Sequence, residues 1–155
     1  MFRPMTAAAI LSSAIAMTAA IAQASDFATP GEAQAMEDKA IAALRANEAT
    51  ALAKFNRADT GFRDRDLYVL CFNTATGMIT AIPDPAQLGK DFRLLAGTDG
   101  SPLGQKIYDT ARSLKDGEMT VVSYNRLSPI TNQPIPAGMY LAKVRNTACG
   151  VGFYK

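Results

Sequence analysis

The chain has 155 residues, a formal net charge of +2 at neutral pH and no histidine. A nucleic-acid-binding protein usually has a concentrated basic surface, and so small a net charge argues against one here. The length fits one folded domain. The absence of histidine excludes Ser-His-Asp and Cys-His nucleophilic machinery and ordinary histidine-ligated haem.

Residues 1–24 are typical of an export signal. An uncharged stretch rich in Ala and Ile covers residues 4–22, and the small-x-small pattern Ala-Gln-Ala follows at residues 22–24. Cleavage there makes Ser25 the first residue of a single mature domain, residues 25–155. An uncleaved anchor is the alternative, because the stretch is nearly long enough to span a bilayer, although its Ala and Ser content makes it weakly hydrophobic. The pattern favours a periplasmic or secreted protein.

A long helix is the first element predicted after the signal. Thr29 suits the N-cap, Pro30 the first helical position and Glu32 the capping-box position, and the end is expected near residues 58–61. Charged residues, Glu37 among them, are assigned to the other faces. An apolar stripe either packs on the protein's own sheet or pairs with a second copy in a homodimer. The stripe consists of Met36, Ala40, Leu44, Ala51, Leu52 and Phe55.

An antiparallel hairpin is predicted next. Leu67 to Phe72 is a nearly continuous apolar run, Asn73 to Gly77 has turn chemistry, and Met78 to Ile82 resumes the apolar pattern. Tyr68 and Phe72 share one face of the first strand, where burial in the core is expected.

The rest of the chain predicts a crossover followed by three strands. Residues 82–98 form a loop or short helical segment, and a helix capped by Ser101 covers residues 102–114. A Pro-rich connection is expected over residues 128–137. The three strand-like runs are residues 118–126, 138–145 and 149–154. With the hairpin, these elements make five strands with flanking helices, which is an α+β fold.

Several short motifs and their order resemble the single Cache family of PAS-like extracytoplasmic sensor domains. Residues 83–85 (Pro-Asp-Pro) and 88–91 (Leu-Gly-Lys-Asp) resemble the family's turns after the hairpin. Residues 122–124 (Val-Ser-Tyr) resemble one of its strands, and residues 149–154 its closing strand. The resemblance covers about residues 29–155. It implies an antiparallel five-stranded sheet with a long N-terminal helix on one face and a ligand pocket on the other.

Members of this family typically bind small metabolites, often short carboxylates, and many are receptor ectodomains. The resemblance therefore implies a chemotaxis-related or other sensory domain that binds a small organic acid. A domain of this size has no room for an output module, so the signal would pass to a membrane receptor, a sensor kinase or a transporter. No enzymatic activity is expected, because no convergent acid, base and nucleophile are visible. The alternative is a structural or interaction module with a degenerate pocket that assembles through its N-terminal helix.

Five residues are candidates for ligand binding. Alternation along their strand puts Tyr124 and Arg126 on one face, so Arg126 could hold a carboxylate bidentately while Tyr124 donates a hydrogen bond. Tyr140 is the matching candidate on the next strand, Tyr108 on the crossover helix could line the pocket, and Arg93 in the loop could attract an anion. The alternatives are core tyrosines with edge hydroxyls and, for the arginines, exposed positions in solvent.

Three features depart from the family pattern, and one is that Thr120, Val121 and Val122 include no Trp where the family often has one. Ile82 stands where the family usually has histidine, and Ala137 where lysine is common. The departures imply that the polar pocket has been rebuilt or lost.

The chain has two cysteines, Cys71 and Cys149. The Cache arrangement makes their strands neighbours, which implies a disulfide in an oxidising compartment. A reactive or metal-binding pair of thiols is the alternative. Without histidine, a zinc site would need carboxylates to complete it, so no metal and no cofactor are expected.

Overall fold

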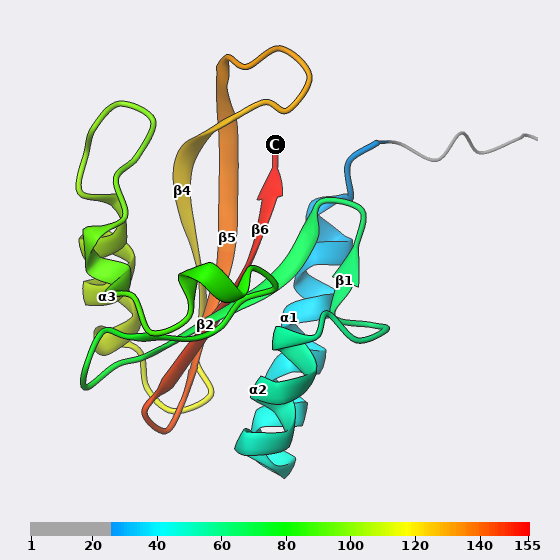
Figure 1. Ribbon diagram of the computed structural model, residues 1–155, viewed down its shortest axis with the longest axis vertical. Helices are drawn as coiled ribbons and strands as arrows, with labels where there is room; N and C mark the ends of the chain where they lie inside the picture. Colours follow the sequence, from blue (N-terminus) through cyan, green and yellow to red (C-terminus); the bar gives the residue numbers. More distant parts are fainter. Residues whose placement is uncertain (1–25) are drawn as a thin grey trace, which may run out of the picture.

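The computed structural model describes residues 26–155 and has an α+β fold with three α-helices and six strands. The predicted export signal, its cleavage site and Ser25 lie outside the described residues. Within the described residues, none of the helices has the length and hydrophobicity that crossing a bilayer requires. Figure 1 shows the sheet between two helical layers, with α1 and α2 on one side and α3 on the other.

Helix α1, Pro30–Ala46, begins with the predicted capping box. The Thr29 hydroxyl accepts a hydrogen bond from the Glu32 N–H (3.2 Å), and the Glu32 carboxylate accepts one from the Thr29 N–H (2.7 Å). Arg65 forms an ion pair with the same carboxylate at 2.6 Å. Reciprocal capping therefore sets the start of the helix where the sequence predicted it.

The prediction of one helix ending near residues 58–61 is wrong, because Asn47 divides it. This residue has an extended backbone, and a second helix, α2 (Glu48–Asn56), follows. The Asn47 side chain accepts a hydrogen bond from the Thr50 N–H (2.9 Å) and so caps α2. A short polar side chain that can bond to the backbone favours such a break over a continuous helix.

The five predicted strands are present, together with a short one. The hairpin consists of β2 (Leu67–Asn73) and β3 (Ile79–Ala81), and β1 is the two-residue strand Arg63–Asp64. The last three strands are β4 (Met119–Leu127), β5 (Pro134–Val144) and β6 (Thr147–Tyr154). Strand β5 begins earlier than predicted, because residues 134–137 continue the ladder with β4.

The sheet is antiparallel and has the C-terminal strand at its centre. Strands β2, β6, β5 and β4 are neighbours in that order, and β1 and β3 both pair with β2. The register places Tyr124 opposite Ala137, and Ala137 opposite Tyr154. Directly opposed residues share one face of a sheet, so this register decides which side chains meet.

The crossover between β3 and α3 contains two 3-10 turns, η1 (Pro85–Gln87) and η2 (Phe92–Leu94). Asp84 and Asp91 cap these turns with their carboxylates, which accept hydrogen bonds from backbone N–H groups at 3.0 Å. The crossover therefore has a fixed path across the sheet.

Helix α3, Leu103–Ser113, packs closely on the crossover. Its N-terminus begins after Pro102 without a side-chain cap, so the predicted cap by Ser101 is wrong. The Gly104 N–H instead donates to the Leu95 carbonyl (2.8 Å). A Cβ on Gly104 would stand 2.0 Å from the Phe92 carbonyl oxygen, so glycine is required for this close approach.

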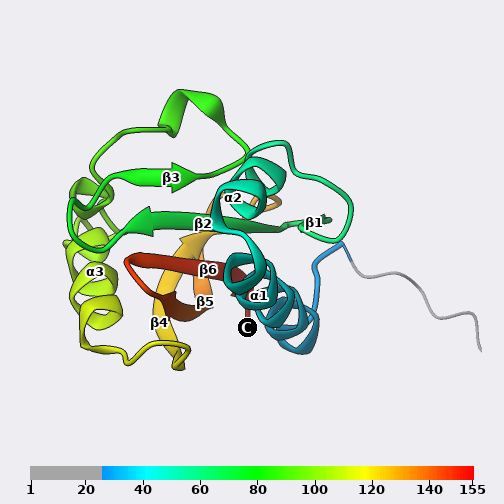
Figure 2. The same cartoon turned by 90° about the horizontal axis from the view of Figure 1, so that it is seen from below.

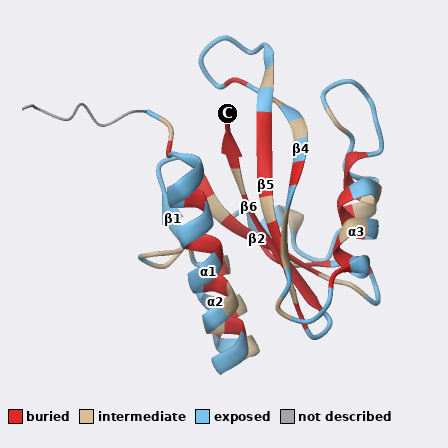
Figure 3. Cartoon of the chain, turned by 180° about the vertical axis from the view of Figure 1, so that it is seen from behind, coloured by how far each residue is buried: buried red, intermediate tan, exposed pale blue. Residues whose placement is uncertain are grey.

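Both faces of the sheet are covered, and Figure 3 shows the buried positions on the strands and on the inner sides of the helices. Helix α1 lies against β5 and β6, and α2 lies against β2 and β3. The predicted apolar stripe is therefore used within the subunit: Met36, Ala40, Leu44, Ala51 and Phe55 are buried, and Leu52 packs beside them. Helix α3 and Phe92 of η2 pack on the other face, and Figure 2 shows α3 apart from α1 and α2.

Glu37 lies in the buried face of α1, and its assignment to an outer face is wrong. The residue is 0% exposed, and neither carboxyl oxygen has a hydrogen-bond partner among the described residues. Burial raises the pKa of this carboxyl well above its ordinary value, and the nearby charge of Asp38 raises it further.

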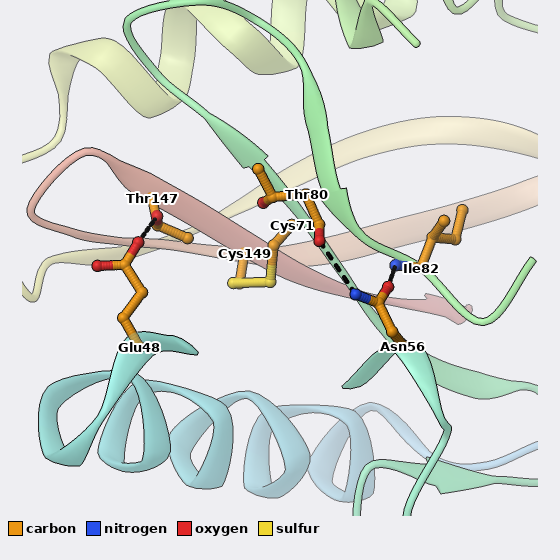
Figure 4. Close-up of a disulfide and its surroundings, with 7 residues drawn as sticks. All are labelled: Glu48, Asn56, Cys71, Thr80, Ile82, Thr147 and Cys149. Atoms are coloured by element: carbon orange, nitrogen blue, oxygen red, sulfur yellow. Dashed lines mark hydrogen bonds between the residues drawn. A yellow bond between two sulfur atoms is a disulfide. The ribbon is translucent and has the colours of Figure 1, made fainter. Parts of the chain in front are cut away.

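A disulfide joins Cys71 of β2 to Cys149 of β6, as predicted. The two residues are directly opposed, with a Cα–Cα distance of 4.1 Å, and both are buried (Figure 4). The bond joins positions separated by 78 residues. In the chain-entropy model, a closed loop of this size stabilises the fold by about 4 kcal/mol.

Asn56, at the end of α2, holds the edge strand β3. Its side-chain amide donates to the Thr80 carbonyl (3.2 Å), and its amide oxygen accepts from the Ile82 N–H (2.9 Å), as Figure 4 shows. These two bonds continue the pattern of a strand ladder and fix the point where the crossover leaves the sheet.

Candidate ligand-binding site

A cavity of about 230 Å³ lies between the sheet and the crossover, on the face opposite to α1 and α2. Its floor comes from β2, β4, β5 and β6, and its wall from α3 and residues 95–98. The lining side chains include Tyr68, Leu70, Leu95, Thr98, Ile107, Tyr124, Arg126 and Met139, with Gly150 and Gly152 on the floor.

Tyr124 and Arg126 converge over one bare position of this floor. The Tyr124 hydroxyl lies 2.9 Å, and the Arg126 Nη1 3.7 Å, from the point that a Cβ on Gly152 would occupy. We call these two donors, together with the Gly152 backbone beneath them, the donor site. A neutral O–H and a guanidinium that meet in a cavity are suited to binding a carboxylate.

The donor site carries a positive charge that no acidic side chain neutralises. Among residues 26–155, Arg126 makes no ion pair, and its guanidinium lies 4.9 Å from the centre of the Tyr154 ring. Burial raises the pKa of Tyr124, although the charge of Arg126 opposes this shift. Tyr124 is therefore a protonated hydrogen-bond donor at neutral pH.

A larger cleft of about 920 Å³ lies beside the first cavity. It lies between β2, β3 and the crossover, and the two share Tyr68, Leu70, Leu95 and Ala96. Its other lining residues are half apolar and half polar or charged. The apolar ones are Ile79, Ile82, Pro83, Phe92 and Leu94, and the polar ones are Arg63, Asp84, Gln87, Lys90 and Asp91. We call this space the crossover cleft.

The sheet register separates Tyr140 from the donor site. Tyr140 pairs with Val121 and Val151, whose side chains lie on the face covered by α1, and its ring packs against Phe153 (5.0 Å between centres). Tyr124 pairs instead with Ala137, so its face carries Met139 and not Tyr140. The structure therefore does not bring Tyr140 to the cavity.

Tyr108 and Arg93 also lie outside both spaces. The Tyr108 hydroxyl donates to the Thr74 carbonyl (2.8 Å), and its ring is buried beside Phe72. Arg93 binds Asp91 through two hydrogen bonds of 2.8 and 2.6 Å, and its guanidinium lies 5.3 Å from the Tyr108 ring centre. These contacts hold η2 against α3, which is a structural role.

Sequence reasoning missed Tyr68 and the two floor glycines. Tyr68 is half-buried and lines both spaces, whereas Phe72 on the same face is fully buried as predicted. Gly150 and Gly152 leave room for the Met139 and Tyr124 side chains across the floor. Alternate glycines in a central strand were the available signal, because they leave one sheet face without side chains.

Comparison with known proteins finds similarity in structure but not in sequence: no family model and no curated protein matches the chain. A methyl-accepting chemotaxis protein from Vibrio parahaemolyticus superposes with a TM-score of 0.59 and 18% identity, over 80% of this chain and 86% of that one.

Two further solved structures cover the same share of this chain, 80%. The periplasmic sensor domain of a chemotaxis protein has a TM-score of 0.55 and 18% identity, over 88% of its length. A Cache chemosensory domain described for its carboxylic acid recognition has a TM-score of 0.53 and 17% identity, over 84% of its length. The chain therefore has the α+β fold of a single Cache domain.

Proposed function

We propose that this protein is an exported sensory domain that binds a small organic anion through a carboxylate. The convergence of the Tyr124 hydroxyl and the Arg126 guanidinium over Gly152 carries the proposal. A guanidinium without an acidic partner and a neutral phenol supply complementary donors for one carboxylate group. The shared fold supports a sensory role, since one of the similar domains is described as recognising carboxylic acids.

The proposed setting is the periplasm, with a membrane protein as the receiver of the signal. The similar structures include a periplasmic sensor domain and a chemotaxis receptor, which supports this setting. The receiver is a receptor, a sensor kinase or a transporter.

Binding is preferred to catalysis on the chemistry of the two spaces. The acidic side chains near the crossover cleft have local structural partners: Asp84 caps η1, and Asp91 is bound by Arg93. A ligand carboxylate at the donor site would meet hydrogen-bond donors and apolar walls, with no paired acid and base.

Binding is also preferred to assembly through the N-terminal helix. The apolar stripe of α1 and α2 is buried against the protein's own sheet, so it is not free to pair with a second copy.

The proposed mechanism is a population shift between open and closed arrangements of the crossover. The two donors belong to β4, whereas Leu95 and Thr98 across the cavity belong to the crossover. A ligand that touches both sides favours the arrangement in which they are closest, and by no more than its difference in affinity for the two arrangements.

A thermal-shift screen tests the proposal. The purified protein is heated with millimolar mono- and dicarboxylates, amino acids and amines, and carboxylates are expected to raise the melting temperature saturably. Arg126→Gln should abolish the shift. Arg57→Gln is the matched control, because Arg57 lies in the exposed end of α2 and pairs with Asp59. A carboxylate shift that survives in Arg126→Gln, or a folded protein that responds to no carboxylate, would overturn the proposal.

A further inference from the structure

We propose that the bound acid is amphipathic: its carboxylate occupies the donor site, and an apolar chain extends from it into the crossover cleft. This inference rests on the proposed function and names the class of ligand. It differs from the expectation of a short carboxylate such as acetate, which would leave the larger space unused.

The two spaces adjoin one another. Tyr68, Leu70, Leu95 and Ala96 line both of them, so a chain leaving the donor site passes between β2 and the crossover. The donor site lies at the β4 end of this route and β3 at the other. The ligand's carboxylate therefore lies at the β4 end, and its apolar chain extends toward β3.

The walls of the crossover cleft suit an apolar chain. Leu70, Ile79 and Phe92 line it from β2, β3 and η2, and Ile82 lines it directly after the end of β3. Burying apolar ligand surface against such side chains is favourable in proportion to the area removed from water.

The charged residues of the cleft do not disturb this environment. Asp91 is held by Arg93 at 2.6 Å, and Asp84 is committed to capping η1. Arg63 and Lys90 are exposed. Their exposure leaves the apolar lining residues available to a ligand chain.

Leu94 and Leu95 give a second, independent indication. They follow one another in the crossover beside the cleft and are 81% and 47% exposed. Two adjacent exposed leucines along an apolar cleft supply further surface for a chain that lies in it.

Isothermal titration calorimetry with straight-chain acids from acetate to decanoate, kept below their micelle-forming concentrations, tests the inference. Affinity is expected to rise roughly fourfold for each added methylene until the cleft is filled. The matched alcohols should bind more weakly at every length. Arg126→Gln should weaken all the acids by a similar factor and leave the dependence on chain length unchanged.

Two variants test the route itself. Ala96→Trp places a bulky side chain where the two spaces join, and Leu95→Asn makes the shared wall polar. Both should reduce decanoate binding at least tenfold and leave acetate within about twofold. Leu127→Asn is the matched control for Leu95→Asn, because Leu127 is 45% exposed and lines neither space.

The outcomes separate the two proposals. If acetate binds as tightly as decanoate and depends on Arg126, the proposed function stands and the amphipathic ligand is wrong. If long acids and alcohols bind equally and Arg126→Gln has no effect, the placement of the carboxylate is wrong. If no acid binds the folded protein, the proposed function itself fails.

Discussion

The hydroxyl of Tyr124 stands 2.9 Å from the point that a Cβ on Gly152 would occupy. These two residues lie on strands that are not neighbours, since β5 separates β4 from β6. The Tyr124 side chain therefore reaches across β5, and the missing side chain of Gly152 gives it room. This relationship places a hydrogen-bond donor over the centre of the sheet, at a position that no single strand specifies.

Gly152→Ala is expected to displace the Tyr124 hydroxyl and weaken binding of propionate and hexanoate about tenfold, which corresponds to the loss of one hydrogen bond to a charged group. Calorimetry measures the affinity, and circular dichroism confirms folding. Gly31→Ala is the control, because it adds a Cβ on α1 that meets nothing closer than the Thr29 hydroxyl at 4.0 Å. Unchanged affinity in Gly152→Ala would contradict the proposed donor site.

Tyr124→Phe and Tyr140→Phe are expected to behave differently, because the two tyrosines lie on opposite faces of the sheet. Loss of the Tyr124 hydroxyl should weaken binding of propionate and hexanoate roughly tenfold, while Tyr140→Phe should leave it within about twofold. Titration calorimetry of both variants provides the comparison. Equal losses of affinity in the two variants would show that the face of the sheet on which each tyrosine lies does not determine binding.

Removal of the Cys71–Cys149 disulfide is expected to destabilise the protein by about 2–5 kcal/mol. The variant is Cys71→Ala with Cys149→Ala, since alanine leaves no polar group at these buried positions. Urea denaturation gives the free energy of unfolding. A reductant should lower the stability of the wild type and have no effect on the double variant; a wild type that is insensitive to reductant would refute the stabilising role.

Asn56→Ala is expected to lower the free energy of unfolding by about 1–3 kcal/mol, because it leaves the Thr80 carbonyl and the Ile82 N–H without their partner. Asn56→Asp keeps the acceptor for Ile82 and should lose less. Hydrogen exchange at the Ile82 amide should accelerate in Asn56→Ala more than in Asn56→Asp. Unchanged exchange in Asn56→Ala would show that β3 is held by other contacts.

Glu37→Gln is expected to stabilise the protein increasingly as pH rises. The pKa of Glu37 is raised in the folded protein by burial, so the folded state retains a proton that the unfolded state releases above its ordinary pKa. Stability from this group is complete below that ordinary pKa and is lost as pH rises toward the raised value, by up to about 1.4 kcal/mol per pH unit.

Urea denaturation of the wild type and Glu37→Gln across the acidic to weakly alkaline range measures this effect. The two proteins should have similar stabilities near the ordinary glutamate pKa and diverge at higher pH. Glu32→Gln is the opposing control: hydrogen bonds to Thr29 and Arg65 lower the pKa of Glu32 to about 2, so its contribution is present at neutral pH and lost in strong acid. A difference in free energy of unfolding between the wild type and Glu37→Gln that does not change with pH would contradict the raised pKa of Glu37.

Local sequence signals located most of the elements of this fold, although they missed the break at Asn47 between α1 and α2. The capping box at Thr29 and Glu32 started α1 correctly, and apolar runs with turn residues between them located the strands. Alternation along β4 correctly put Tyr124 and Arg126 on one face. These signals act over a few residues, so they can be interpreted before any tertiary contact is known.

The tertiary structure alone decided what each face meets. The pairing of Tyr124 with Ala137 places Tyr140 on the opposite face of the sheet. Tyr68, which was expected in the core, lines both spaces because of the path that the crossover takes. Strand register and loop paths depend on contacts between residues far apart in the chain, which local patterns do not contain. The sequence by itself thus determined the start of α1, the five longer strands and the shared face of Tyr124 and Arg126, and only the assembled sheet decided that these two donors meet over Gly152 in a cavity.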